Sequence, residues 1–333
     1  MKLGFGIITC QRYPGDARSD EDLYADALDL AVYAEELGFD SVWTSEHHFV
    51  DDGYLPALLP MCAAIAARTS RVEIGTGLLL MPLHDPLRIA EDAAVVDLLS
   101  RGRLILGLGL GWRDEEFEGF GVPMGERVPL LEDAIRVLRG AWSGEAISAH
   151  GVAVPVTPRP GRPTGPPIWI GAWAEPAVRR AGRIADGFVA SGGTPAEFAE
   201  QVGWASQEGG DRPPALGLHS RTFAWNGSAD EAWDLVKPFM RYVSWKYDDM
   251  DGARGRSGPP PSPPPMTAEE ERALRAEIIV GTPDQVAHQI GGYRQVAGDD
   301  LHFIADLYWP GMDPQLQREA MRIFAEEVVP LLR

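Results

Sequence analysis

The feature that most constrains the fold of this chain is a regular alternation of strand-like and helix-like segments. Short apolar runs without a helical period predict buried strands, and longer stretches with apolar residues every three or four positions predict amphipathic helices. Eight strand–helix pairs in strict order predict parallel strand pairing throughout. The expected strands are 3–9, 41–44, 71–81, 103–110, 167–172, 187–190, 215–225 and 301–307, and the expected helices are 20–37, 55–68, 87–99, 128–142, a segment ending at 183, 195–207, 229–247 and 314–332.

A count of eight parallel strands predicts an α/β fold in which the sheet closes into a (β/α)8 TIM barrel. Apolar runs such as 104–106 fit strands that are buried on both faces, as barrel strands are. An open, doubly wound sheet is the alternative. The 333 residues, of which 45% are hydrophobic, suffice for one large core, so a single domain is expected over 1–333.

Two segments interrupt the alternation. The first, about 144–165, predicts a hairpin or an extended excursion after the fourth helix. The second, about 248–277, lies before the last βα units and contains a proline-rich run from Ser257 to Pro265. This run predicts a semi-rigid polyproline stretch, either a mobile cover over the barrel mouth or a solvated insertion. Thr267 and Glu270 then predict the capped start of a new helix.

The charge balance limits the classes of partner. The formal net charge is -19, from 49 acidic and 30 basic residues, so the surface would repel nucleic acids and anionic membranes. A small-molecule substrate fits better. The two cysteines, Cys10 and Cys62, lie too far apart in sequence to suggest a metal motif or a disulfide framework. No signal peptide or membrane-spanning stretch is recognisable, so a cytoplasmic location is expected.

In such a barrel, function resides at the C-terminal ends of the strands. Glu46, His47 and His48 directly follow the second expected strand, and a neutral imidazole there can accept or donate a proton near pH 7. One of the histidines could equally be a buried hydrogen-bonding residue. Adjacent residues of an extended chain point to opposite faces, so the pair cannot easily share a metal, and no metal is expected.

Glycines and helix starts mark three further strand ends. Gly75 and Gly77 suggest a bulge, or a close approach of backbone to a flat ligand, in the third strand. The glycines of 107–111 lack the spacing of a dinucleotide fingerprint, and they could simply allow tight packing. Pro176 suits the first turn of a helix after the fifth strand, where backbone N–H groups could bind a phosphate.

Together these motifs resemble the luciferase-like monooxygenase family, which includes bacterial luciferase, FMN-dependent monooxygenases and deazaflavin (F420)-dependent oxidoreductases. Each short motif is weak, but six occur in the family's order between residue 3 and about residue 330. The matching segments are 45–49, 75–82, 107–117, 121–127, 170–172 with 181–187, and 281–286.

The resemblance implies roles for individual residues. His47 matches the catalytic histidine beside the reactive edge of the flavin ring, and Glu46 matches an acidic neighbour in the same site. Gly77-Leu78 matches a non-prolyl cis peptide that bulges the third strand against the ring. Relatives often carry Gly or Ser where this chain has Trp173 and Ala174, and the nearby Glu175 adds a negative charge, which puts the phosphate site in doubt. The expected cofactor-binding residues are Thr76, Gly77, Leu78, Glu115, Gly171, Ala172, Trp173 and Ala174.

Two chemistries fit the resemblance. The first is an FMN-dependent monooxygenase that uses O2 and reduced FMN from a separate flavin reductase. The second is an F420-dependent hydride-transfer oxidoreductase. The charge of -19 favours FMN, because the polyglutamyl tail of F420 would prefer a basic groove. A non-catalytic flavin-binding protein and a metal-dependent barrel hydrolase are remote alternatives, and the hydrolase's usual His-x-His is absent from the first strand.

The substrate and the assembly are less constrained. Four tryptophans near expected strand ends suggest an aromatic-rich pocket for an apolar or planar molecule, unless two or more belong to the core. The resemblance implies a homodimer. The four tryptophans are Trp43, Trp112, Trp169 and Trp173.

Overall fold

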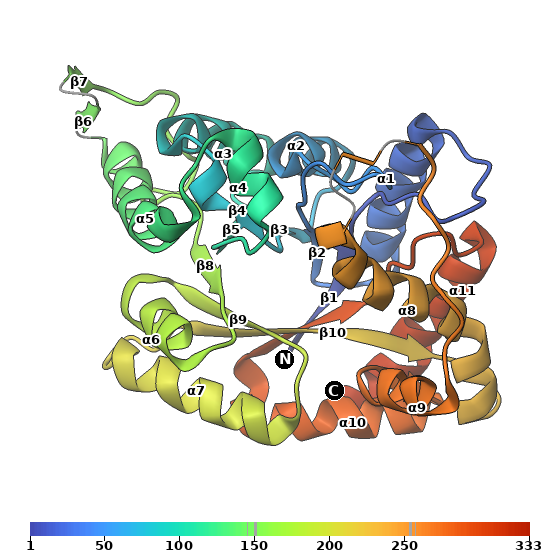
Figure 1. The fold of residues 1–333 in the computed structure, drawn as a ribbon. Coiled ribbons are helices and arrows are strands. Elements are labelled where there is room, and N and C mark those ends of the chain that lie inside the picture. The colour runs from blue at the N-terminus through green and yellow to red at the C-terminus, as the bar shows by residue number, and fades with distance from the viewer. Residues whose placement is uncertain (145, 150–151, 253–254, 257) are drawn as a thin grey trace.

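In the computed structural model, which describes residues 1–144, 146–149, 152–252, 255–256 and 258–333, parallel strands form a closed barrel surrounded by helices (Figure 1). β12 pairs in parallel with both β10 and β1, and β9 pairs with β10. This closure confirms the expected barrel and rules out the open sheet. The barrel strands are β1 (Lys2–Ile8), β2 (Ser41–Thr44), β3 (Glu73–Thr76), β5 (Leu104–Gly109), β8 (Ile168–Gly171), β9 (Gly187–Ser191), β10 (Ala215–Ala224) and β12 (Leu301–Asp306).

The helices follow the strands as the sequence predicts, with two additions. The first helix is capped by Gly38, whose φ of 85° is the left-handed conformation expected there. At the start of the helix after the proline-rich run, Thr267 forms the expected capping box with Glu270. The additions are α4 and α10. The helices are α1 (Asp20–Leu37), α2 (Leu58–Arg68), α3 (Pro86–Ser100), α4 (Asp114–Phe120), α5 (Arg127–Ser143), α6 (Glu175–Ile184), α7 (Pro195–Gly209), α8 (Ala229–Gly252), α9 (Ala268–Ala276), α10 (Pro283–Ala297), α11 (Pro314–Ile323) and α12 (Val329–Leu332).

The inside of the barrel is filled by large side chains that face small residues. Trp43 and Trp169 are buried there with ring centroids 5.6 Å apart. A Cβ atom on Gly75 would lie 2.2 Å from the Trp43 ring, so only glycine fits at that point. These two tryptophans are therefore core residues, while Trp112 and Trp173 are 43% and 50% exposed.

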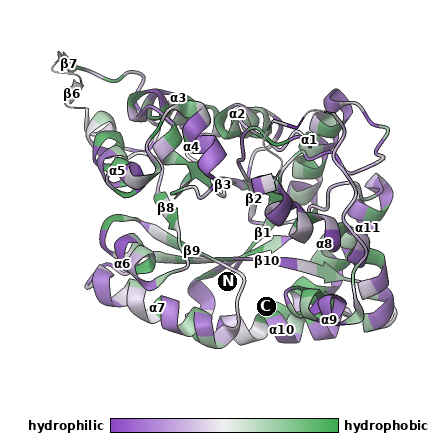
Figure 2. Ribbon diagram, viewed as in Figure 1, coloured by the Kyte–Doolittle hydropathy of each residue, from purple (hydrophilic) through white to green (hydrophobic). Residues whose placement is uncertain are grey.

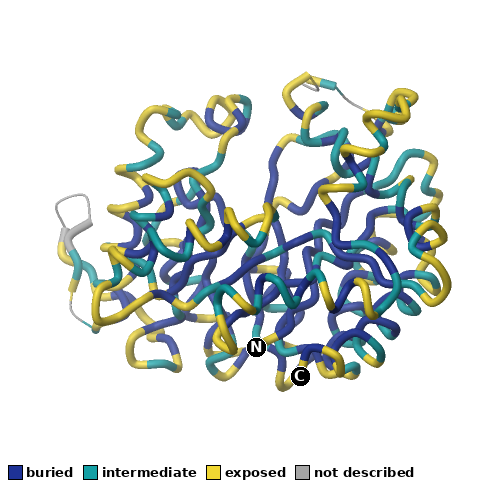
Figure 3. Tube along the Cα trace, turned by 90° about the horizontal axis from the view of Figure 1, so that it is seen from below, coloured by how far each residue is buried: buried dark blue, intermediate teal, exposed yellow. Residues whose placement is uncertain are grey.

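A second apolar layer lies between the strands and the surrounding helices. Much of the strand sequence is hydrophobic, with polar residues within β10, and the helices carry hydrophilic residues on their outer faces (Figure 2). Burial accordingly falls from the central strands to the periphery (Figure 3). Both faces of the sheet are covered, as a parallel barrel requires. None of the described helices is long and apolar enough to cross a membrane.

The two predicted interruptions have different structures. β6 (Ile147–Ala149) and β7 (Val152–Val154) pair antiparallel and project from the edge of the barrel, which confirms the expected hairpin (Figure 1). In the second interruption, Ser257 lies outside the described residues. Arg241 of α8 donates a 2.8 Å hydrogen bond to the carbonyl of Pro263, so the proline-rich run is fixed to the outside of α8. The chain then returns through β11 (Ile279–Gly281), which pairs with β10.

Candidate active site

A cavity of about 870 Å³ occupies the barrel mouth. Its walls come from the ends of β1 and β12, the middle of β10 and the loops after β2, β3 and β9, together with α8, residues 276–279 and α10. This volume lies within the range of small-molecule and cofactor sites. The polar and glycine residues of these walls include Thr9, Ser45, Gly77, Gly192, Arg221 and Asp306.

The third predicted strand is interrupted where it meets the cavity. It divides into β3 and a two-residue strand, β4 (Leu79–Leu80), and the Gly77–Leu78 peptide bond between them is cis, as the resemblance implied. Thr76 donates a 2.7 Å hydrogen bond to the carbonyl of Gly107. The Leu78 side chain lies over Gly171, where a Cβ atom would approach it to 2.0 Å. Residues 76–78 thus pack on the glycines of the neighbouring strands, and Gly77 faces the cavity.

His47 is held by a carboxylate that the sequence did not single out. Its Nδ1 lies 2.9 Å from Oε1 of Glu116, in the first turn of α4. Both side chains are buried. Burial would raise the pKa of Glu116, but the hydrogen bond and charge of His47, the backbone N–H of His48 and the charge of Arg113 together outweigh it, and the pKa is lowered. An ionised carboxylate only accepts hydrogen bonds, so Nδ1 carries a proton, and in the neutral imidazole Nε2 is then the acceptor.

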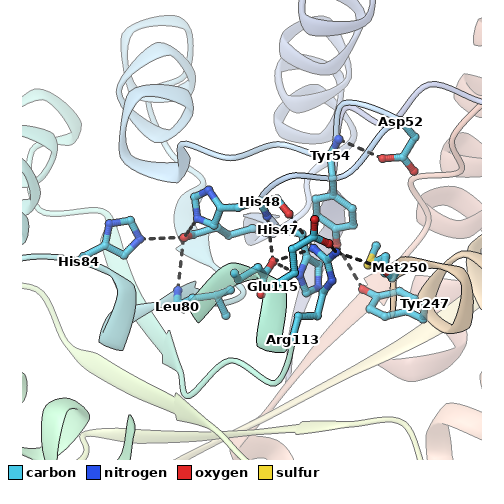
Figure 4. Close-up of polar contacts among 12 residues, drawn as sticks. His47, His48, Asp52, Tyr54, Leu80, His84, Arg113, Glu115, Tyr247 and Met250 are labelled. Carbon is cyan, nitrogen blue, oxygen red and sulfur yellow. Dashed lines mark hydrogen bonds and ion pairs between the residues drawn. The ribbon is translucent and has the colours of Figure 1, made fainter. Parts of the chain in front are cut away.

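Arg113 fixes this pair to the surrounding loops (Figure 4). Its side chain is 1% exposed. One terminal nitrogen lies 3.4 Å from Glu116 and 2.6 Å from the carbonyl oxygen of His48, while the other donates to Glu115 at 2.9 Å and to the carbonyl of Met250 at 3.1 Å. One guanidinium therefore joins the loop after β2, the start of α4 and the end of α8.

Glu46 points away from His47 into a separate network. Its Oε1 accepts hydrogen bonds from Nε2 of His48 at 2.6 Å and from Nε2 of His84 at 2.7 Å, and its Oε2 accepts from the backbone N–H of Leu80 at 3.3 Å. Burial would raise the pKa of Glu46, but the two histidines lower it. The network attaches the loop after β2 to the turn that follows β4 (Figure 4).

The ligand atoms of Glu46, His48 and His84 lie within 4.8 Å of one another, which is close enough to hold a metal. The two imidazole nitrogens are 2.6 and 2.7 Å from the same carboxylate oxygen. Ligands around a tetrahedral zinc are about 3.3 Å apart, given metal–ligand bonds of about 2 Å. The distances fit direct hydrogen bonds better than a shared cation.

The predicted phosphate turn lies beside the cavity. Ala174 is the N-cap of α6 and makes no side-chain capping bond, but Pro176 has no N–H and that of Ala177 donates to the carbonyl of Ala174 at 2.9 Å, which leaves the N–H of Glu175 for a ligand. The carboxylate of Glu175 pairs with Arg179 at 2.8 Å, which neutralises the charge that had put the turn in doubt. Trp173 extends to Gly193, where an added Cβ would lie 2.8 Å from the indole.

The structure brings the predicted site residues to the same end of the barrel, but most of them do not line the cavity. Among them, only Gly77 lines the cavity itself. His47 lies behind Tyr54 and Tyr247, with ring centroids 4.8 and 5.7 Å away, and both tyrosines do line the cavity. Glu115 pairs with Arg113. Polar residues at the ends of the first and eighth strands and within the seventh strand also line the cavity and were missed: Thr9, Asp306, His219 and Arg221.

This fold and this arrangement of strand ends are those of a known enzyme class. The family model described as luciferase-like monooxygenase matches residues 1–300. The chain belongs to this family and is an oxidoreductase.

Several relatives have defined names. A Kineococcus radiotolerans protein named F420-dependent glucose-6-phosphate dehydrogenase is 32% identical over all of this chain and 97% of its own length. A Microbacterium testaceum protein of the same name is 31% identical over 97% of both chains. Among solved structures, monooxygenase RslO1 from Streptomyces bottropensis has a TM-score of 0.83 and 25% identity over 99% of both chains. The F420-dependent tetrahydromethanopterin reductase from Methanopyrus kandleri shares the fold, with a TM-score of 0.72 and 17% identity over 100% of this chain and 99% of its own.

Proposed function

We propose that this protein is an F420-dependent oxidoreductase that transfers hydride between the coenzyme and a hydroxyl-bearing carbon of a small molecule. The comparisons support both the FMN and the F420 interpretations, and they support F420 better, because the relatives that match across the whole chain carry F420-dependent names. The expectation of FMN rested on net charge. That charge describes the whole surface, whereas a coenzyme meets only the groups of one cavity.

The cavity has features that fit a coenzyme. It has sufficient volume, and Gly77 presents backbone rather than a side chain to it. Residues 76–78 would support the ring, and the turn from Gly171 to Ala174 would bind the phosphate. Bound F420 supplies a carbon that accepts or returns a hydride.

The observation that carries the proposal is the His47–Glu116 pair. With Nδ1 donating to Glu116, Nε2 of His47 can accept a proton. When an alcohol is oxidised, its carbon loses hydride to the coenzyme, its O–H proton moves to Nε2, and the product is a carbonyl compound. Glu116 stabilises the imidazolium that results, because its negative charge then pairs with a cation instead of a neutral imidazole. His47 is thus proposed as the base and Glu116 as the residue that positions it.

The direct test is a titration of the purified apoprotein with F420 and with FMN, followed by absorbance and fluorescence. We expect F420 to bind at least tenfold more tightly than FMN. A preference for FMN by the same factor would overturn the proposal.

An FMN-dependent monooxygenase is the second candidate. It is favoured by the similarity to monooxygenase RslO1, whose TM-score of 0.83 exceeds that of the F420-dependent reductase. Oxygen consumption with reduced FMN and no F420 would distinguish the two, since the F420 proposal predicts none beyond the free-flavin rate. The single domain, the homodimer, the cytoplasmic location and, for this candidate, the flavin reductase stay predictions.

A further inference from the structure

The wall of the cavity formed by β1, β10 and β12 carries a second set of polar groups that the proposed proton transfer does not use. Arg221 and Asp306 are partners in the parallel register of β10 and β12, and His219 precedes Arg221 by two residues. Residues two apart on a strand share a face, so these three side chains point to the same side of the sheet. All three line the cavity together with Thr9.

Two atoms of this wall lack a partner in the described part of the chain. Thr9 is 8% exposed, and its Oγ1 is fully buried without a hydrogen bond. The same is true of Nδ1 of His219. Buried polar atoms are nearly always paired in folded proteins. Because both residues face a cavity, a bound molecule is the natural partner for these atoms.

The charge state of the wall favours an uncharged ligand. Burial, with a smaller effect of Arg221, lowers the pKa of His219 to about 4, so its imidazole is neutral at pH 7. Burial raises the pKa of Asp306 to about 6, which still leaves the carboxylate mostly ionised at pH 7. Its negative charge offsets the positive charge of the neighbouring Arg221.

The rest of the cavity does not supply the charge that a phosphate group needs. Among the described lining residues, Arg221 is the single lysine or arginine, against the carboxylates of Glu197, Glu277 and Asp306. The N-terminus of α7, a natural anion site, also borders the cavity. Glu197 already occupies it, because its carboxylate accepts hydrogen bonds from the backbone N–H of Thr194 at 2.7 Å and from the Thr194 hydroxyl at 2.9 Å.

From this juxtaposition we propose that Thr9, His219, Arg221 and Asp306 form a substrate subsite for an uncharged, hydroxyl-rich molecule such as a free sugar or polyol. Arg221 donates hydrogen bonds and Asp306 accepts them, while Thr9 can do either. A sugar presents both donors and acceptors, and a sugar phosphate would add a dianion beside three carboxylates. The inference rests on the proposed F420-dependent function and separates this chain from relatives named for glucose 6-phosphate.

The test measures binding and turnover separately. Calorimetry on the apoprotein, repeated with F420 present, uses a panel of free hexoses, pentoses and polyols together with glucose 6-phosphate and inorganic phosphate. We expect at least one uncharged compound to bind at least tenfold more tightly than glucose 6-phosphate and to be the better substrate by the same factor in kcat/KM. Inorganic phosphate should not compete with it. Preference for glucose 6-phosphate, or no binding of any uncharged compound at 100 mM, would overturn the subsite.

Variants link the binding to the named residues. Thr9→Val removes the unpaired hydroxyl at nearly constant volume and should weaken sugar binding about fivefold to tenfold, as the loss of one hydrogen bond does. Thr164→Val, at an exposed position outside the cavity, is the matched control and should leave binding unchanged. Equal affinity in Thr9→Val and the wild type would contradict the assignment. Failure of F420 to bind, with sugar binding intact, would instead reject the proposed function alone.

Discussion

The two sides of the barrel mouth are built in opposite ways. On the side of β2 and α4, the buried carboxylates of Glu46 and Glu116 are hydrogen-bonded to histidines, and their pKa values are lowered. On the side of β1, β10 and β12, the carboxylate of Asp306 has a raised pKa, and Thr9 and His219 have unpartnered atoms. On the first side the charged groups pair with one another, although Nε of Arg113 and Oε2 of Glu116 have no hydrogen bond in the described part of the chain, whereas on the second side the unpartnered atoms belong to residues that line the cavity. We therefore assign proton transfer to the first and substrate recognition to the second.

The largest effect on stability should come from the guanidinium that holds the first side together. Arg113→Met would leave Glu116 buried without its cationic neighbour, and removing one partner of a buried ion pair costs about 3 to 5 kcal/mol. Urea denaturation measures this loss in the free energy of unfolding. Arg272→Met, at an exposed position, is the control and should change it little. A loss below 1 kcal/mol would mean that the first side is not preorganised.

Substitution of the proposed base should give the largest effect on catalysis. His47→Ala should lower kcat at least about a hundredfold, because it removes the proposed base, while F420 affinity stays within severalfold. Steady-state kinetics and the cofactor titration measure the two quantities. Unchanged turnover would remove His47 from the mechanism.

Substitution of two adjacent glutamates tests which carboxylate supports His47 in catalysis. Glu116→Gln should reduce kcat by about tenfold to hundredfold, because the amide cannot stabilise the imidazolium as a carboxylate does. Glu115→Gln, which changes a residue bound to Arg113 but not to His47, should have an effect of at most severalfold. A larger loss for Glu115→Gln would favour the residue that the family resemblance selected.

On the second side, the ionised carboxylate of Asp306 should make the folded protein less stable as the pH rises. Because burial raises the pKa of Asp306 from 3.8 to about 6, the folded protein holds this proton more tightly than the unfolded chain does. The ionised residue therefore lowers stability at pH 7 to 8, and this penalty disappears as the pH falls below about 4. Asp306→Asn, whose amide oxygen can still accept from Ile7, should be more stable than the wild type by about 2 kcal/mol at pH 8.

Thermal melts from pH 4 to pH 8 measure this difference. The exposed Asp211→Asn is the matched control and should show no such trend. If Asp306→Asn were less stable than the wild type at pH 8, the ionised carboxylate of Asp306 would stabilise the fold, contrary to this prediction.

The smallest expected effect concerns metal removal. Dialysis against a chelator should leave the melting temperature within 1 °C, because Glu46 is already satisfied by the N–H groups of His48 and His84. A fall of several degrees, restored by zinc, would show that the three residues hold a cation and would revive the hydrolase alternative.

The barrel could be predicted from the sequence because strand and helix periodicities are strong and local. The predicted bounds of 20–37 and 41–44 match α1 and β2. α10 was missed, although Thr282 at its N-cap and Pro283 in its first turn are clear start signals. The predicted strand 71–81 is divided because its backbone turns at Gly77, which a periodic pattern does not reveal.

The candidate site was less predictable because it depends on helix phase and on contacts distant in sequence. Glu115 and Glu116 are adjacent, and successive residues of a helix point about 100° apart. Only the position of α4 against the loop after β2 determines that Glu116 reaches His47. Asp306 ends its strand and could have been identified by reading all eight strand ends for polar groups, but Arg221 lies within the long β10 and is placed beside Asp306 only by the pairing of β10 with β12.

The division between the two sides is tested most directly by comparing kcat and KM in wild type, His47→Ala and Thr9→Val, with F420 and the free sugar or polyol that gives the highest kcat/KM. We predict that His47→Ala loses kcat with KM within severalfold, and that Thr9→Val raises KM about fivefold to tenfold with kcat within twofold. If Thr9→Val instead lowered kcat as much as His47→Ala, or His47→Ala changed only KM, proton transfer and substrate recognition would not reside on separate walls.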